Sequence, residues 1–245
     1  MIVIPMAGAS SRFSQQGYHK PKFMLPLKKN NVFEYSLIRF KRLFDTEFFL
    51  FIILEQSNTE NFIKSSIAKL GINHFGIVSL EHKTAGQAET VYLGLNHFNS
   101  NVDQPLIIFN IDTICIDYNF NNFLDYNYYD GVLEVFKDEG SHWSFVLPDN
   151  KEEKLVLRTT EKERISDLCC SGLYQFRDKH IFDFAFIKEM ESPTYNELFV
   201  APLYNHLINS GCPISYFETK KECLVFAGIP SEYEIAKSLE LPDLS

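Results

Sequence analysis

The sequence predicts an α/β fold built on a mainly parallel sheet that helices cover on both faces. In residues 1–115, short apolar segments alternate with helix-like segments in the order strand, helix, strand, helix, strand, helix, strand. The apolar segments are nearly continuous, which is typical of strands buried on both faces of a parallel sheet. After residue 115 this alternation is lost, and shorter strand-like segments with Asp- and Gly-rich turns follow.

The first half contains seven predicted elements. Strands are expected at Ile2–Pro5, Phe48–Leu54, Phe75–Leu80 and Leu106–Asn110, and helices at Val32–Phe44, Asn58–Leu70 and Ala85–Phe98. In sheets of this kind, ligands bind beyond the carboxyl ends of the strands. The loop at Ala7–Ser11 and the side chain of Asp112 both follow such ends, so we expect them to meet at one site.

The second half contains shorter predicted elements. Strands are expected at Gly131–Phe136, Ser144–Leu147, Lys154–Thr159, Leu168–Phe176, Pro213–Glu218 and Cys223–Phe226, and helices at Asp178–Phe186, Glu197–Asn209 and Ser231–Leu239. The sequence shows no internal repeat and no linker between the halves. A length of 245 residues suits one α/β domain, so we expect a single domain over residues 1–245.

Charge is distributed unevenly along the chain. The formal net charge is −9, yet residues 1–42 carry eight Lys or Arg side chains and a single acid, Glu34. The acidic total argues against a general nucleic-acid binder, whereas the positive N-terminal segment suits a small polyanionic ligand. Three of the cations, Arg39, Lys41 and Arg42, are expected on a solvated helix face.

The cysteines and apolar runs indicate the compartment. The five cysteines show no metal-ligand spacing such as C-x-x-C, which favours free thiols in a reducing cytoplasm. Cys169 and Cys170 are neighbours in a predicted strand and should point to opposite faces. The longest apolar run is too short to span a bilayer, and the N-terminus lacks the pattern of a secretory signal. We therefore expect a cytoplasmic protein with no nucleic-acid or membrane partner, while a homo-oligomer stays open.

The N-terminal strand leads into a loop of small residues that suits a phosphate chain. Ala7–Ser11 lets backbone N–H groups approach phosphate oxygens, and its two serines add hydroxyl donors. Arg12 offers a forked cation and Lys22 a compact one. The spacing is neither that of a Walker A loop nor G-x-G-x-x-G. An ordinary glycine-containing turn with surface cations is the alternative that we disfavour.

Together with Lys20–Pro26, this segment resembles the signature of the sugar-phosphate nucleotidyltransferases. That signature has the form A-G-x-[GS]-[ST]-R-[FL] followed by [KP]-P-K-x-[LM]-[LM]-P, and here Ser10 stands where many members have a second Gly. The resemblance implies a Rossmann-like α/β/α sandwich with a mixed, mainly parallel central sheet and a small inserted β subregion. It also implies a nucleotide-binding half, residues 1–115, and an acceptor-binding half, residues 116–245, with Arg12, Lys22 and Asp112 as catalytic residues.

Two further segments match the family. Thr84–Thr90 corresponds to the segment that faces the nucleobase, where the Gln87 amide could bond to a base edge. Asn110–Asp112 corresponds to the strand end whose Asp holds Mg²⁺, and a single carboxylate with phosphate oxygens and water suits that ion. A capped helix start and an Asp that begins a turn are the alternatives. The implied nucleotide-binding residues are Ala7, Gly8, Ala9, Ser10, Ser11, Thr84, Gly86, Gln87, Ala88 and Asn110.

The family's second metal ligand has no counterpart in this sequence. It is an Asp in a late W-x-D-x-G-T-P-like stretch, and Phe226 occupies that position in Cys223–Pro230. The ligand is therefore missing, displaced, or supplied by a neighbour such as Glu222. Asp112 is the one metal ligand that we predict.

Motifs in the second half resemble the acceptor site of the family. Glu161 and Lys162 resemble a pair in which Glu contacts the acceptor and Lys its phosphate, although a plain surface ion pair is the alternative. Ser171–Tyr174 resembles the strand that floors the acceptor pocket, and Glu197 resembles a residue at a helix start. The implied acceptor-binding residues are Glu161, Lys162, Ser171, Gly172 and Glu197.

These motifs predict an enzyme that transfers a nucleoside monophosphate to a phosphorylated small molecule with Mg²⁺ and releases pyrophosphate. The Gln87 segment and Ala201–Asn205 are most similar to small cytidylyltransferases of capsular phosphoramidate synthesis. That similarity implies CTP as the donor, L-glutamine phosphate as a candidate acceptor and a role in surface polysaccharide precursors. A sugar-1-phosphate cytidylyl- or uridylyltransferase is the nearest alternative. A catalytically inactive nucleotide-binding domain, motivated by Phe226, and a glycosyltransferase, which would need a D-x-D-type motif, are alternatives of other classes.

Overall fold

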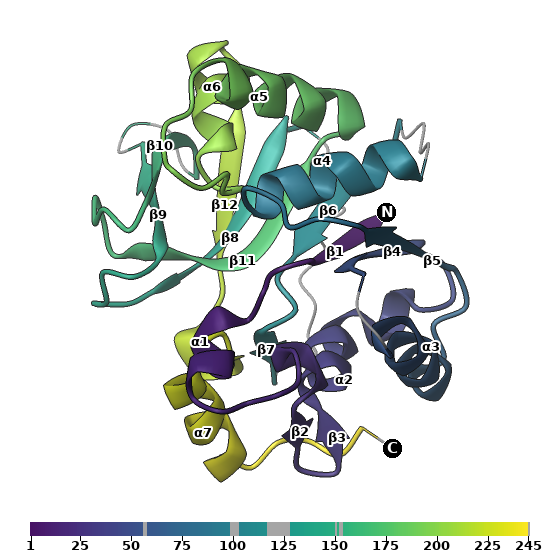
Figure 1. Cartoon of the computed structure of the whole chain (residues 1–245). Coiled ribbons are helices and arrows are strands. Elements are labelled where there is room, and N and C mark those ends of the chain that lie inside the picture. The colour runs from purple at the N-terminus through teal and green to yellow at the C-terminus, as the bar shows by residue number, and fades with distance from the viewer. Residues whose placement is uncertain (56–57, 99–102, 117–127, 150, 152–153, 245) are drawn as a thin grey trace.

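The computed structural model describes residues 1–55, 58–98, 103–116, 128–149, 151 and 154–244. These residues form a nine-stranded mixed sheet with helices on both faces, together with two small two-stranded sheets (Figure 1). This arrangement confirms the predicted α/β class and the Rossmann-like layering.

The first half of the chain contributes the parallel part of the sheet. Its strands are β1 (Ile2–Met6), β4 (Phe49–Leu54), β5 (Phe75–Leu80) and β6 (Leu106–Phe109). They lie in the order β6-β1-β4-β5, and each neighbouring pair is parallel. β1, β4 and β6 are buried along nearly their whole length, which explains their continuous apolar sequences. The predicted bounds of these four strands differ from the observed bounds by at most one residue at either end.

The second half adds the antiparallel part. Its strands in the large sheet are β8 (Gly131–Lys137), β9 (Ser144–Pro148), β10 (Val156–Glu161), β11 (Leu168–Phe176) and β12 (Ile214–Glu218). β11 joins the two parts because it pairs antiparallel with β6, β8 and β9. The small sheets pair β2 (Pro26–Leu27) with β3 (Asn30–Asn31), and β7 (Thr113–Cys115) with β13 (Leu224–Phe226).

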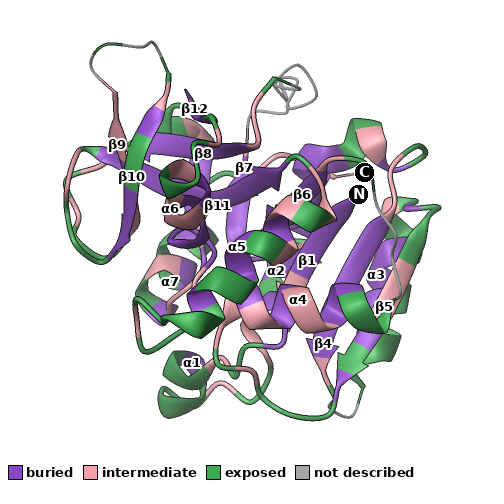
Figure 2. Cartoon of the chain, turned by 90° about the horizontal axis from the view of Figure 1, so that it is seen from above, coloured by how far each residue is buried: buried purple, intermediate pink, exposed green. Residues whose placement is uncertain are grey.

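Helices cover the two faces of the large sheet and create two cores. One face carries α4 (Gln87–His97), α5 (Lys179–Glu191) and α6 (Leu203–Asn209), and the other carries α2 (Val32–Leu37) and α3 (Thr59–Leu70) (Figure 1). Alternate residues of β1 enter opposite cores: Val3 packs in the core that contains Val91 of α4, and Ile4 in the core that contains Phe33 of α2. The central strands are buried, whereas α3, α4 and α5 also carry exposed residues (Figure 2).

Three predicted helices have clearly different bounds in the structure. The helix predicted at Asp178–Phe186 continues to Glu191 as α5. The helix predicted at Val32–Phe44 is α2 followed by a 3₁₀ segment, Ile38–Leu43. The helix predicted at Glu197–Asn209 begins only at Leu203, after Pro202. The backbone of Leu198 is engaged elsewhere, because its N–H donates to the Ala85 carbonyl and its carbonyl accepts from the Ala88 N–H. The prediction that Glu197 starts a helix was therefore wrong.

The predicted solvated position of Arg39 was also wrong. Its side chain is buried, and its guanidinium donates to both carboxylate oxygens of Glu134 at 3.0 and 2.8 Å. A buried guanidinium requires such a bidentate partner. Lys41 and Arg42 are exposed, as predicted.

The cysteines are free thiols in the structure. Cys169 and Cys170 belong to different hydrophobic clusters, which agrees with side chains on opposite faces of β11. Among the described residues, none of the helices combines the length and apolar character that a membrane span requires.

Candidate active site

A cavity of about 910 Å³ opens where the parallel strands end. It is lined by sixteen of the eighteen predicted site residues, which come from segments as distant in sequence as Ala7 and Glu197. The two exceptions are Ser11, which is exposed at the start of α1 (Ser11–Gln15), and Ala88, which is fully buried in the core under α4. The topology thus assembles the predicted residues around one space, and their individual roles remain predictions.

The loop after β1 is anchored to the segment that carries Lys22. Ser10 has a left-handed backbone, with φ of 48°, and its hydroxyl oxygen accepts a hydrogen bond from the Lys22 N–H at 3.2 Å. The space beside Gly8 is open, since a Cβ atom built there would meet nothing within 4 Å. Arg12 is exposed on α1 and lines the same cavity. The loop therefore presents backbone, hydroxyl and guanidinium groups to the cavity.

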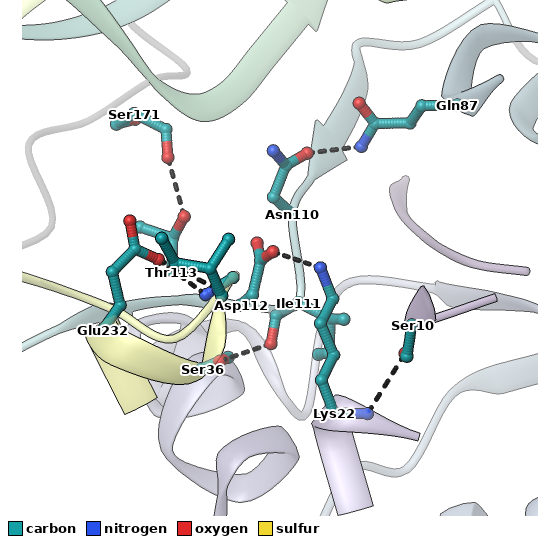
Figure 3. A network of polar contacts seen from close by, with 12 residues as sticks. Ser10, Lys22, Ser36, Gln87, Asn110, Ile111, Asp112, Thr113, Ser171 and Glu232 are labelled. Carbon is teal, nitrogen blue, oxygen red and sulfur yellow. Dashed lines mark hydrogen bonds and ion pairs between the residues drawn. The ribbon is translucent and has the colours of Figure 1, made fainter. Parts of the chain in front are cut away.

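Lys22 and Asp112 form an ion pair between two distant segments (Figure 3). The side chain of Lys22 is 28% exposed and that of Asp112 is 19% exposed, so both remain accessible from the cavity. The backbone around Asp112 is held on both sides, because the Asp112 carbonyl accepts from the Ala227 N–H at 2.8 Å and the Ile111 carbonyl accepts from the Ser36 hydroxyl at 2.7 Å. A carboxylate and an ammonium group are thus fixed beside the Ala7–Ser11 loop.

The segment expected to face the nucleobase is close to Asp112. The Gln87 amide donates to the Asn110 side-chain oxygen (Figure 3). Gly86 allows the chain to pass Leu198, since a Cβ atom on Gly86 would stand only 2.7 Å from the Leu198 carbonyl carbon. This close approach also brings Glu197 to the wall of the cavity.

Gly172 allows strand β11 to meet the end of β6. Its φ of +96° lies in the region that favours glycine, and a Cβ atom would stand 2.6 Å from the Asn110 amide nitrogen. The Gly172 carbonyl accepts from the Asn110 N–H at 2.9 Å. The pairing of β11 with β8 shifts register between Cys170 and Tyr174, around this glycine. The irregularity gives the Asn110 side chain the space in which it meets Gln87.

Glu161 and Lys162 lie at the other side of the cavity. Glu161 is the last residue of β10, because β10 pairs with β9 as far as Ser144. The strand predicted at Lys154–Thr159 therefore begins and ends about two residues later. The Glu161 side chain is 8% exposed, accepts from the Ser144 hydroxyl and lies 3.6 Å from the Lys162 ammonium. Burial raises the pKa of Glu161, against the opposing effects of Ser144 and Lys162. This burial excludes an ordinary surface ion pair.

The stretch without the family's second Asp has an aromatic side chain in the cavity wall. Phe226 packs against Trp143, with ring centroids 4.6 Å apart, and against Phe136 at 5.2 Å. The suggested substitute, Glu222, is exposed and does not line the cavity.

The sequence analysis missed Glu232, which lies in the first turn of the last helix, α7 (Pro230–Ser238). One carboxylate oxygen accepts from the N–H groups of Gly228 and Ile229 at 2.9 and 3.2 Å. A Cβ atom on Gly228 would stand 2.8 Å from a carboxylate oxygen of Asp112 and 3.4 Å from one of Glu232, so the two acids flank the same small space (Figure 3). Burial, with a smaller contribution from Asp112, raises the pKa of Glu232. A Glu two residues after Pro230 in the sequence signals only a helix cap.

Asp112 and Glu232 could hold a magnesium ion whose coordination shell is completed by a substrate phosphate. Among the described residues, no group of three or more His, Cys, Asp or Glu side chains could hold a metal ion by itself. Mg²⁺ typically uses one or two carboxylates together with phosphate oxygens and water. Asp112, with Glu232 nearby, meets that requirement only when a phosphate is present.

Comparison with known structures identifies the family. The chain is 39% identical to a nucleoside-diphosphate-sugar pyrophosphorylase from Vibrio cholerae RC9, with a TM-score of 0.91 over 98% of this chain and 100% of that one. It shares its fold with an inositol-1-phosphate CTP transferase from T. maritima (14% identity, TM-score 0.72, 96% of this chain and 93% of that one). It also shares it with a UDP-glucose pyrophosphorylase complexed with UDP-glucose (18% identity, TM-score 0.72, 96% of each chain).

No protein-family model matches the chain, and neither does any curated protein. The Vibrio cholerae relative decides the assignment because its similarity extends over both chains at 39% identity. The chain therefore belongs to the nucleotidyltransferase family that includes the nucleoside-diphosphate-sugar pyrophosphorylases, and it is an enzyme of the nucleotidyltransferase type.

Proposed function

We propose that the protein transfers CMP from CTP to a phosphorylated small molecule, with Mg²⁺ as the cofactor, and releases pyrophosphate. The observation that carries this proposal is one cavity whose lining includes the loop Ala7–Ser10, the Lys22–Asp112 pair and the Glu161–Lys162 pair. Residues 1–115 would bind the nucleotide and residues 116–245 most of the acceptor, within a single domain.

The proposed reaction needs no covalent enzyme intermediate. An oxygen of the acceptor phosphate attacks the α-phosphorus of CTP and forms a new P–O bond. The bond between the α-phosphorus and the bridging oxygen breaks, and its electron pair leaves with pyrophosphate. Because the nucleophile is already anionic, the enzyme acts mainly by positioning and by stabilising charge.

Each group in the cavity has a role in this reaction. The loop at Ala7–Ser10 and the guanidinium of Arg12 would bind the triphosphate, and Lys22 would neutralise charge at the α-phosphate. Mg²⁺, when bound at Asp112 with Glu232 nearby, would supply further positive charge to the phosphates. The ion pair between Lys22 and Asp112 holds the ammonium group in position before the nucleotide arrives.

The donor and acceptor are the finer part of the proposal. Gln87 offers an amide to a base edge, and its bond to Asn110 fixes the orientation of that amide. The T. maritima protein of the same fold is named as a CTP transferase, which supports CTP as a donor for this fold. We propose L-glutamine phosphate as a candidate acceptor and the synthesis of surface or capsular polysaccharide precursors as the process. A sugar-1-phosphate acceptor with CTP or UTP is the second candidate, supported by the similarity to the Vibrio cholerae protein.

Two measurements test the proposed function. The first is a thermal-shift screen of CTP, UTP, ATP, GTP and dTTP with Mg²⁺, in which CTP should raise the melting temperature most, because a ligand that binds only the folded state stabilises it. The second is pyrophosphate release with each nucleotide and a panel of phosphorylated acceptors. Nucleotide binding without release from any pair would favour a catalytically inactive domain. Release of a nucleoside diphosphate instead would favour a glycosyltransferase.

A further inference from the structure

One wall of the cavity is aromatic. It consists of His142, Trp143 and Phe226, which we call the aromatic wall. The rings of His142 and Trp143 lie 4.2 Å apart, and those of Trp143 and Phe226 lie 4.6 Å apart. His142 is exposed, and the other two are half-buried, so all three retain surface that faces the cavity. A ligand group in the cavity can therefore contact these rings.

Charged groups of both signs line the cavity. The cations are Arg12, Lys22, Lys83 and Lys162, and the acids are Asp112, Glu161, Glu197 and Glu232. Three of these acids lie near the aromatic wall or the Glu161–Lys162 pair: Glu232 lies 4.0 Å from His142, Glu161 accepts from Ser144 next to Trp143, and Glu197 is close enough to Glu161 to help raise its pKa.

These three carboxylates have a consequence for the acceptor. The phosphate of the acceptor needs a cation, and Lys162 can supply it from its position 4.7 Å from the Phe199 ring. Three carboxylates around the same space would repel a second anionic group and attract a positive one. Aromatic ring faces bind alkylammonium groups through cation–π interactions, which are strongest for Trp.

We propose that the acceptor is the phosphate of a small alkylammonium compound, whose cationic group lies against Trp143 and Phe226 while its phosphate lies near Lys162. This inference rests on the proposed function and specifies its acceptor. L-glutamine phosphate carries an ammonium group on its α-carbon together with a carboxylate, whereas glucose 1-phosphate carries no cationic group. Phe226, at the position where the family has a metal ligand, is then a residue that determines acceptor specificity.

The test compares two acceptors that differ only in charge, together with a sugar phosphate. The full chain with CTP and Mg²⁺ is assayed for pyrophosphate release with phosphocholine, with its neutral isostere 3,3-dimethylbutyl phosphate, and with glucose 1-phosphate. We expect kcat/KM for phosphocholine to exceed that for the isostere by ~3- to 30-fold, the range of a cation–π contact. Equal values for the two, or higher activity with glucose 1-phosphate, would overturn this inference and leave the proposed function intact.

Variants of the wall provide a second test. Phe226→Leu keeps an apolar side chain but removes the ring, and should raise KM for phosphocholine by about tenfold with little change in KM for CTP. Phe226→Tyr keeps the ring and should retain the wild-type KM. Trp143→Leu should act as Phe226→Leu does, and thermal melting shows that each variant folds. An unchanged KM for phosphocholine in folded Phe226→Leu and Trp143→Leu would refute the aromatic wall as its site. Absence of release with every acceptor and nucleotide would instead refute the proposed function itself.

Discussion

Replacing Lys22 by alanine separates catalysis from stability. The ammonium group of Lys22 pairs with Asp112, and both side chains are partly exposed, at 28% and 19%. Exposed pairs of this kind contribute at most about 1 kcal/mol to the free energy of unfolding. For a chain of this size, such a loss lowers the melting temperature by roughly 2–4 °C. The folded structure should therefore survive the substitution.

The expected loss of activity is much larger. A preorganised group that stabilises charge in the transition state typically contributes on the order of 10²- to 10³-fold to kcat. We expect Lys22→Ala to lower kcat for pyrophosphate release by that factor, measured at saturating CTP and acceptor. Lys20→Ala is the matched control, since Lys20 is exposed two residues away and does not line the cavity. Equal kcat values for the wild type and Lys22→Ala would refute the role of Lys22.

Three further predictions concern the scaffold and the acceptor side. Gly172→Ala should destabilise the protein by roughly 1–3 kcal/mol in denaturant titration, since its positive φ and its approach to Asn110 exclude a Cβ atom; unchanged stability would contradict this. Arg39→Met should lower the free energy of unfolding by about 3–5 kcal/mol, because the buried carboxylate of Glu134 would lose its cationic partner. The double variant Arg39→Met with Glu134→Leu should recover much of that loss of stability. Burial acts to raise the pKa of Glu134, but Arg39 outweighs it and lowers that pKa, so this stability should be present above the unfolded-state pKa and fall as pH drops through the folded-state pKa. For Glu161, whose pKa is raised, kcat/KM for the acceptor should decline on the acid side with a pKa above 4.5, and this limb should be absent in Glu161→Gln.

The phosphate loop and the strand end at Asp112 could be predicted because their signals are local. A small-residue loop after a buried strand, followed by Arg12 and Lys22, is contiguous in sequence, and so is a polar triplet after an apolar run. Parallel topology then places both at one edge of the sheet. The structure brings them together as expected, in the ion pair between Lys22 and Asp112.

The positions that could not be predicted depend on contacts between distant segments. Arg39 lies in a stretch of basic residues that suggests a solvated face, yet its partner Glu134 is 95 residues away. The helix predicted from Glu197 starts later because the backbone of Leu198 bonds to Ala85 and Ala88, more than 100 residues earlier. Neither partner can be recognised from the local sequence.

Asn110 shows why the two halves of the chain form one site. Its side-chain oxygen accepts from Gln87 on the nucleotide side, while its amide nitrogen lies where a side chain on Gly172 would stand. Its backbone N–H donates to the Gly172 carbonyl of β11, the strand that we propose as the floor of the acceptor site. A shift of β11 would therefore move Asn110, the amide of Gln87 and the adjacent Asp112 together. Since proximity of two reactants depends on sub-ångström placement, this shared anchor couples acceptor position to nucleotide position.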